Sequence, residues 1–185
     1  MEAQIKMKSL LIKNIGLLQT PVGSYSHKGE KQGENLKLEN AAVFIEDGVI
    51  KEVTADGALP EAAATAGAVL NAEGCLVTPG LVDAHTHLVF GGYRQNEIPL
   101  KLKGAGYLDI LAAGGGILDT VRHTRQASAD ELYDKTEAFL DEMLSLGVTT
   151  CEAKSGYGLD MENELKMLRV VQKLNAAHKI DLVST

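Results

Sequence analysis

The sequence has no tryptophan, only two cysteines and no long apolar run. Cys75 and Cys151 lie far apart and outside any CxxC pattern, which is typical of reduced thiols in a reducing compartment rather than of a disulfide framework. We interpret both as buried small hydrophobic residues. Residues 1–18 mix lysines with short apolar runs and lack the apolar segment of a signal peptide or the length of a transmembrane span. We therefore expect a cytoplasmic protein with no membrane partner.

Positive charge is also scarce. Lysine and arginine number 18 against 25 acidic residues, which gives a formal net charge of -7. Phosphate binding requires a local concentration of Lys and Arg, and no stretch of the chain provides one, so we expect no nucleic-acid partner. A small acidic substrate would need one local positive group. The hydrophobic content of 45% over 185 residues is enough for one sizeable core and a smaller second one.

The first part of the chain has the pattern of short strands and turns. Two apolar runs, 42–45 and 49–53, are joined through Asp47-Gly48, a dipeptide that favours the tight turn of a β-hairpin. Residues 21–40 carry polar residues and glycine without apolar periodicity, and predict an exposed loop. This half therefore predicts a small β domain.

After Pro79-Gly80 the pattern changes to strands that alternate with helices. Strands are expected over 81–87, over 148–153 and from 180 onward, and helices over 128–146 and 160–178. This alternation predicts an α/β fold with a parallel sheet or barrel. We assign residues 1–78 to a β-sandwich portion and residues 79–185 to the first units of a TIM-type (β/α)8 barrel. A closed barrel typically needs about 250 residues, so the barrel is incomplete in this chain.

Two histidines lie at the end of the first expected barrel strand. Side chains two apart on a strand point to the same face, so His85 and His87 can direct two imidazoles at one point. Neutral imidazoles suit either zinc or iron, and barrel active sites lie at the carboxyl ends of strands. The alternative is a chance HxH motif. A catalytic site normally has three protein ligands and a water, so these two are an incomplete set.

Two further residues are candidates for substrate binding. Arg94 follows the histidines in a glycine-containing loop and can offer a bidentate guanidinium to a carboxylate. Tyr157 follows the second barrel strand between two glycines that let the backbone turn sharply and present a phenol to a pocket. The plainer alternatives are a solvated loop arginine and a tyrosine packed on the next helix. We interpret Lys154, in the same loop, as an ordinary surface or salt-bridged lysine.

Several segments together resemble a known family. The segment Pro79 to His87, with sequence PGLVDAHTH, resembles the first metal-binding strand of the amidohydrolase superfamily. The resemblance narrows to imidazolonepropionases through the run HTHLVFGG with Arg94, the glycine-rich turn at 114–117, and Glu152 with the segment 154–159. It extends from about residue 76 to the end of the chain.

The resemblance implies hydrolysis of the ring amide of 4-imidazolone-5-propanoate to N-formimidoyl-L-glutamate, a step of histidine degradation, with one zinc or iron ion. By motif, His85 and His87 would be metal ligands, Arg94 would hold the propanoate carboxylate, and Tyr157 would line the substrate pocket. The remaining ligands and the acid/base residues would come from later strands, so we name no catalytic residue in this chain and expect it to be inactive alone.

Two alternatives stay open. Another amidohydrolase, such as a deaminase or cyclic amidase, would share the histidines but would have less use for Arg94. A non-catalytic remnant that binds a partner would have no use for the histidines as ligands. The sequence distinguishes neither zinc from iron nor a monomer from a homodimer.

Overall fold

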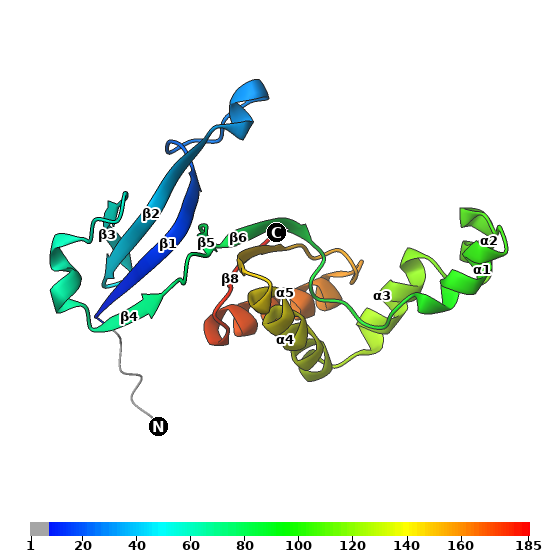
Figure 1. The fold of residues 1–185 in the computed structure, drawn as a ribbon. Helices are drawn as coiled ribbons and strands as arrows, with labels where there is room; N and C mark the ends of the chain where they lie inside the picture. The colour runs from blue at the N-terminus through cyan, green and yellow to red at the C-terminus, as the bar shows by residue number, and fades with distance from the viewer. Residues whose placement is uncertain (1–7) are drawn as a thin grey trace. The chain divides into compact units, whose positions relative to one another are not determined.

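The computed structural model describes residues 8–185 and divides into two compact units between Pro79 and Gly80 (Figure 1). Residues 1–7, which belong to the segment for which no signal peptide is expected, lie outside the described residues. Within residues 8–185, no helix is both long and apolar enough to cross a bilayer.

The first unit is a five-stranded sheet with strand order β3-β2-β1-β4, and β5 also pairs with β1. The strands are β1 (Ser9–Pro21), β2 (Asn35–Glu46), β3 (Val49–Thr54), β4 (Ala68–Asn71) and β5 (Leu76–Val77). Neighbours β1, β2 and β3 are antiparallel, whereas β4 and β5 run parallel to β1. Two short 3₁₀ helices, η1 (Gly29–Gly33) and η2 (Glu61–Thr65), lie in the connections.

The predicted hairpin is confirmed. Strands β2 and β3 are joined by Asp47 and Gly48, whose φ angles are +49° and +78°. Positive φ at both central residues is the geometry of a type I′ turn, whose twist matches that of the strands.

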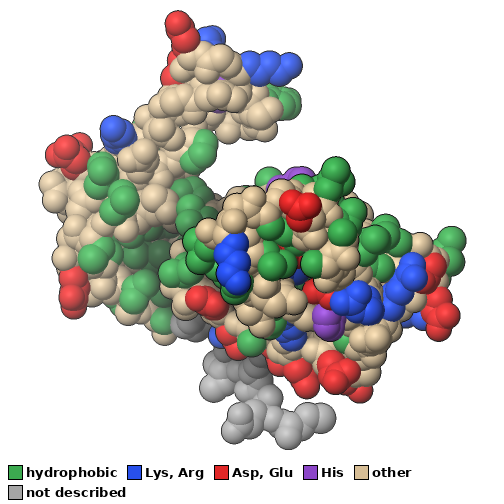
Figure 2. All heavy atoms as spheres, turned by 90° about the vertical axis from the view of Figure 1, so that its right-hand side faces the viewer, with side chains coloured by type: hydrophobic (Ala, Val, Ile, Leu, Met, Phe, Trp, Pro, Cys, Tyr) green, Lys and Arg blue, Asp and Glu red, His purple; other side chains and the backbone are tan. Residues whose placement is uncertain are grey.

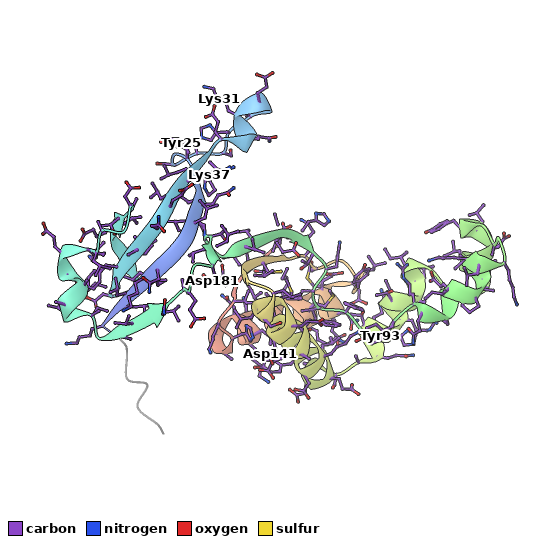
Figure 3. The ribbon with its side chains drawn as sticks, viewed as in Figure 1. Tyr25, Lys31, Lys37, Tyr93, Asp141 and Asp181 are labelled. Carbon is purple, nitrogen blue, oxygen red and sulfur yellow. The ribbon has the colours of Figure 1, made fainter. Side chains whose placement is uncertain are left out.

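The predicted loop over 21–40 is wrong at its C-terminal end. Strand β2 already begins at Asn35 and pairs with the end of β1, where Leu36 lies opposite Thr20. The long partner strand supplies backbone hydrogen bonds that the weak apolar pattern of this segment did not reveal. Figure 3 shows Tyr25 and Lys31 at the tip of this hairpin, beyond the paired strands.

Both faces of the first sheet carry a small apolar cluster. One contains Ile15, Leu18, Ala41 and Val43, and the other contains Leu11, Ala42 and Phe44 together with alanines of η2. The alternation between adjacent residues of β2 follows from the two-residue period of a strand. Cys75, interpreted above as buried, is exposed in this unit, because the turn before β5 leaves its side chain outside both clusters.

The second unit has a parallel sheet in the order β6-β7-β8. Its strands are β6 (Leu81–Thr86), β7 (Val148–Ala153) and β8 (Asp181–Ser184), and its long helices are α4 (Ala129–Ser145) and α5 (Met161–Ala177). These elements confirm the strands and helices predicted for this half. Shorter helices fill the connection from β6 to α4: η3 (Gln95–Glu97), α1 (Ile98–Leu102), α2 (Tyr107–Ala112) and α3 (Ile117–Gln126).

The helix ends are capped by side chains. Ser128 and Glu131 form the expected capping box at the start of α4, and Asp160 accepts a hydrogen bond from the Asn163 amide at the start of α5. Lys166 donates to the carbonyls of Thr124, Arg125 and Ala127 at the end of α3. A cation at a helix C-terminus satisfies carbonyls that have no intrahelical partner.

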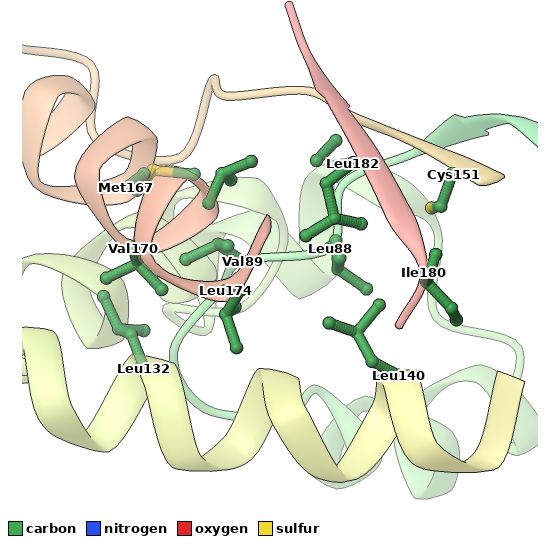
Figure 4. Packing of buried hydrophobic residues seen from close by; sticks show 12 residues of the cluster. Leu88, Val89, Leu132, Leu140, Cys151, Met167, Val170, Leu174, Ile180 and Leu182 are labelled. Carbon is green, nitrogen blue, oxygen red and sulfur yellow. The ribbon is translucent and has the colours of Figure 1, made fainter. Parts of the chain in front are cut away.

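The helices bury one face of the second sheet (Figure 4). Cys151 on β7 and Leu182 on β8 point toward Leu140 of α4 and Leu174 of α5, and burial raises the pKa of the Cys151 thiol. The buried position expected for this cysteine is confirmed. Large apolar side chains of the same sheet are exposed, among them Leu81 and Val82 on β6 and Val183 on β8, and in Figure 2 hydrophobic side chains are visible at the surface.

Replacing Leu140, which is fully buried, should lower the stability of the second unit. We expect Leu140→Ala to reduce the free energy of unfolding by about 2–5 kcal/mol, because truncation leaves a cavity in a close-packed core. Urea unfolding followed by far-UV circular dichroism measures the change. The matched control is Leu146→Ala, because Leu146 is 71% exposed and its truncation should change the free energy by less than about 0.5 kcal/mol. Equal effects of the two substitutions would contradict this packing.

Candidate functional site

A cavity of about 290 Å³ opens beside the carboxyl ends of β6 and β7. Its lining combines one imidazole, one phenylalanine ring, two phenol rings, one guanidinium and one threonine hydroxyl. The lining residues are His87, Phe90, Tyr93, Arg94, Thr120 and Tyr157. Three of the four residues singled out in the sequence therefore meet at one cavity, although they come from segments up to 70 positions apart.

His85 and His87 lie at the end of β6. Both side chains are exposed, and their ring centroids are 6.0 Å apart with the planes at 68°. The Asp83 carboxylate accepts a hydrogen bond from the backbone amide of His85 at 3.3 Å, so it orients the strand end rather than an imidazole. His85 is not among the residues that line the cavity.

The two imidazoles fit part of a metal site. Ring nitrogens bind zinc at about 2.0–2.1 Å, so rings with centroids 6.0 Å apart can share one ion after a small movement. Within residues 8–185, however, no group of three or more His, Cys, Asp or Glu side chains is placed to hold a metal. The described residues thus provide two donors of a set that normally has three or more.

Arg94 lies near a buried glutamate that sequence reasoning missed. Its Nε lies 3.9 Å from Oε1 of Glu97, and the Lys101 ammonium lies 3.1 Å from Oε2 of the same carboxylate. The Gly116 amide donates to Oε1 at 2.6 Å. This hydrogen bond, with the pairing to Lys101 and Arg94, lowers the pKa of Glu97 below its ordinary value despite burial. The only sequence signal was the four-residue spacing from Glu97 to Lys101.

The loop that carries Tyr157 is held by a second carboxylate that the sequence did not single out. Glu164, in the first turn of α5, accepts hydrogen bonds from the amides of Gly156, Gly158 and Leu159 at 2.7–2.8 Å. Desolvation raises the pKa of Glu164, but the amide donors outweigh it and lower the pKa overall. Gly156 has a φ of +122°, a backbone conformation that side chains disfavour.

The Tyr157 ring packs on the candidate metal ligand. Its centroid lies 5.0 Å from that of His87, with the planes tilted by 45°, and 6.4 Å from that of Phe90. Tyr157 also packs against the core cluster that includes residues of α5, so the plainer alternative, a tyrosine packed on the next helix, stays open beside the pocket role. The Tyr157 ring contacts His87 and also forms part of the cavity lining.

The Gly91-Gly92 pair lets the loop after β6 approach helix α3. A Cβ on Gly91 would lie 2.5 Å from the backbone of His123, closer than any real contact, and the Gly91 amide donates to the Thr124 hydroxyl at 2.9 Å. A side chain at Gly91 would therefore push the loop and Arg94 away from α3.

Lys154 is salt-bridged, as expected. Its ammonium lies 2.8 Å from Oε1 of Glu152, which also accepts a hydrogen bond from the Thr185 hydroxyl at 3.1 Å. The hydrogen bond from Lys154 is the main cause of the lowered pKa of the Glu152 carboxyl, and the positive charge of His85, when protonated, acts in the same direction.

Comparison with proteins of known sequence gives the family relationship. The chain is 52% identical over 184 residues to an imidazolonepropionase of Bacillus cytotoxicus, a match that covers 97% of this chain and 42% of the relative. It is 58% identical over 149 residues to an imidazolonepropionase of Bacillus mycoides, which covers 80% of this chain and 34% of the relative. The chain is homologous to the imidazolonepropionases. It spans about two fifths or less of the length of these two relatives, and no family model matches it.

Solved structures show the same fold. The chain aligns with the ochratoxinase of A. niger at a TM-score of 0.58 and 19% identity, over 97% of this chain and 31% of that one. It aligns with an atrazine chlorohydrolase mutant from Arthrobacter aurescens, crystallised with zinc and atraton, at a TM-score of 0.56 and 19% identity, over 95% and 35% of the two chains. The fold class is therefore the one that these structures share with the chain: the first units of an α/β barrel, preceded by part of a β-sandwich.

Removing the charge of Glu164 should loosen the Tyr157 loop. We expect Glu164→Gln to lower the free energy of unfolding by roughly 1–2 kcal/mol at pH 7, because hydrogen bonds to a charged acceptor are stronger than those to a neutral one. The folded pKa is below the ordinary value of 4.5, so this contribution is complete above that value and is lost as the pH falls through the folded pKa.

Urea unfolding at pH 7 and at pH 3 measures both parts of this expectation. The matched control is Glu162→Gln, an exposed glutamate in the same helical turn, which should change the free energy by only a few tenths of a kcal/mol. A difference between wild type and Glu164→Gln that stays constant from pH 7 to pH 3 would show that the carboxylate charge is not what holds the loop.

Proposed function

We propose that the chain supplies the first part of a metal-dependent hydrolase that opens the cyclic amide of 4-imidazolone-5-propanoate to give N-formimidoyl-L-glutamate. The observation that carries this proposal is the meeting of His87, Arg94 and Tyr157 at one cavity, in a chain that is 52% identical to an imidazolonepropionase over 97% of its length. The hydrolysis itself belongs to a longer polypeptide, because the relatives extend well beyond the matched part.

His85 and His87 would hold one zinc or iron ion, since two imidazoles at a strand end suit both metals. When bound, the metal would lower the pKa of a water molecule and polarise the ring carbonyl. The chain's contribution at this point is the placement of the two ligands. The Tyr157 ring, tilted by 45° to that of His87, packs against the imidazole and limits its freedom.

Arg94 would hold the propanoate carboxylate of the substrate. Its side chain is 44% exposed, and it lines the cavity from a loop whose Gly91 amide donates a hydrogen bond to Thr124 of α3. The 3.9 Å separation from Glu97 makes this ion pair a weak one, which leaves the guanidinium hydrogens available to a substrate. Phe90, Tyr93 and Tyr157 would then enclose the ring, as aromatic side chains do in small-molecule pockets.

A different amidohydrolase activity is the second candidate. The fold is shared with enzymes named for other substrates, a triazine hydrolase and an ochratoxinase, so the fold alone does not choose among them. The guanidinium in the cavity favours a substrate that carries a carboxylate.

The isolated chain should bind zinc weakly and should not hydrolyse 4-imidazolone-5-propanoate, because two protein ligands are an incomplete set. Isothermal titration with zinc and an absorbance assay of substrate loss test the two parts. We expect His85→Ala and His87→Ala each to weaken zinc binding by at least about tenfold, and His123→Ala, an imidazole on α3, to leave it unchanged. Zinc binding that is indifferent to His85→Ala would favour a non-catalytic remnant, and turnover by the isolated chain would contradict the incomplete set.

The role of Arg94 can be tested in a hybrid in which this chain replaces the matched segment of the Bacillus cytotoxicus imidazolonepropionase. We expect the hybrid to hydrolyse 4-imidazolone-5-propanoate and Arg94→Met to lower kcat/KM about 10- to 100-fold, because a charged hydrogen-bonded pair is lost. The control substrate is the propanamide analogue, which lacks the negative charge and should respond much less. An equal loss of kcat/KM with both substrates would show that Arg94 does not bind the substrate carboxylate. An inactive hybrid that folds and binds zinc would count against the proposed reaction.

A further inference from the structure

We propose that Lys135 is a positioning residue for the carboxylate-binding loop: its ammonium clamps residues 90–94 onto helix α4 and so sets the position of Arg94. The inference rests on the proposed function in one respect: the group that Arg94 binds is taken to be the substrate carboxylate. The clamp itself is a property of the second unit, independent of any ligand.

The Lys135 ammonium lies within a cage of aromatic rings and one carbonyl. Its Nζ is 3.7 Å from the centroid of the Phe90 ring and 3.8 Å from that of the Tyr93 ring, and it donates a hydrogen bond to the Gly92 carbonyl at 2.7 Å. A cation over the face of an aromatic ring within about 6 Å is attracted by the ring quadrupole. One side chain of α4 thus contacts three residues of the loop: Phe90, Gly92 and Tyr93.

These three contacts bear directly on the cavity. Phe90 and Tyr93 form part of its lining together with Arg94, which is the next residue along the loop. Phe139, one turn further along α4, stacks on Phe90 with centroids 6.0 Å apart and planes at 14°. Figure 3 shows Tyr93 beside α3, on the stretch that connects β6 to the short helices. The Lys135 ammonium is therefore a charged group among the aromatic contacts that join this loop to α4.

The titratable groups that neighbour Lys135 lie on α4, on α3 and in the loop. The groups that share its surface hollow are Glu131 on α4 and His123 on α3, and the Tyr93 phenol belongs to the loop. Desolvation is the cause that lowers the pKa of Lys135 to about 8. The ammonium should accordingly lose its proton just above neutral pH, and with it the attraction to both rings, so the clamp holds below about pH 8 and loosens above it.

Nuclear magnetic resonance of the 185-residue chain tests the clamp without any substrate. We expect the backbone amides of Gly92, Tyr93 and Arg94 to shift with pH along a curve whose midpoint lies near 8. In Lys135→Met this transition should vanish. In Lys135→Arg, whose cation does not titrate in this range, the amides should keep their low-pH positions up to pH 10.

The matched control is Lys173→Met. Lys173 also lies over an aromatic ring, with its Nζ 4.4 Å from the Tyr133 centroid, but it does not line the cavity. This variant should leave the transition of the three loop amides intact. Absence of the transition in the wild type, or its persistence in Lys135→Met, would overturn the clamp.

Ligand binding separates this inference from the proposed function. The probe is 3-(imidazol-4-yl)propanoate, a stable imidazole that carries the same carboxylate, titrated at pH 7 and at pH 9.5. We expect Lys135→Met to weaken binding about tenfold at pH 7, Lys135→Arg to stay near the wild type, and the wild type to weaken toward the level of Lys135→Met at pH 9.5. Binding that depends on Arg94 but not on Lys135 would refute the positioning role and leave the proposed function standing. A chain that shows the amide transition but binds no probe would retain the clamp and count against the carboxylate site.

Discussion

The structure of the second unit depends on the burial of one face of a three-stranded parallel sheet beneath α4 and α5. Cys151, Ala153 and Leu182 of the strands pack against the helices. The hydrophobic effect makes this packing the main contribution to the stability of the unit. Because the strands are parallel, their carboxyl ends lie at one edge. The loops that leave this edge therefore bring His87 and Tyr157 into contact.

Charged side chains then fix those loops by bonding to the backbone. Glu97 accepts from the Gly116 amide, Glu164 accepts from three amides of the Tyr157 loop, and Lys135 donates to the Gly92 carbonyl. Each charge satisfies backbone groups in a segment that has no regular secondary structure to satisfy them. The cavity thus depends on polar contacts for its shape, whereas the sheet below it depends on apolar packing.

Much of this arrangement could be predicted because it is encoded locally. The β2–β3 turn follows from Asp47-Gly48, and α4 begins at the Ser128 capping box, since both signals act over three or four residues. The start of β2 at Asn35 was not predicted, because it depends on pairing with the end of β1, whose Pro21 lies opposite Asn35 across residues 22–34. The positions of the two histidine side chains also could not be predicted from the alternation of side chains along a strand. The reason is that the pairing of β6 with β7 shifts register between Asp83 and Thr86.

The sequence by itself determined the alternation of strands and helices after Gly80, and it predicted a two-part organisation and four candidate site residues, because residue type and short-range spacing carry that information. Only the tertiary structure decided which of them share a cavity: His87, Arg94 and Tyr157 do, and His85 lies beside them. It alone revealed Glu97, Glu164 and Lys135 as the groups that hold the loops. Their partners are backbone atoms and aromatic rings up to 45 positions away, and no local pattern specifies such contacts.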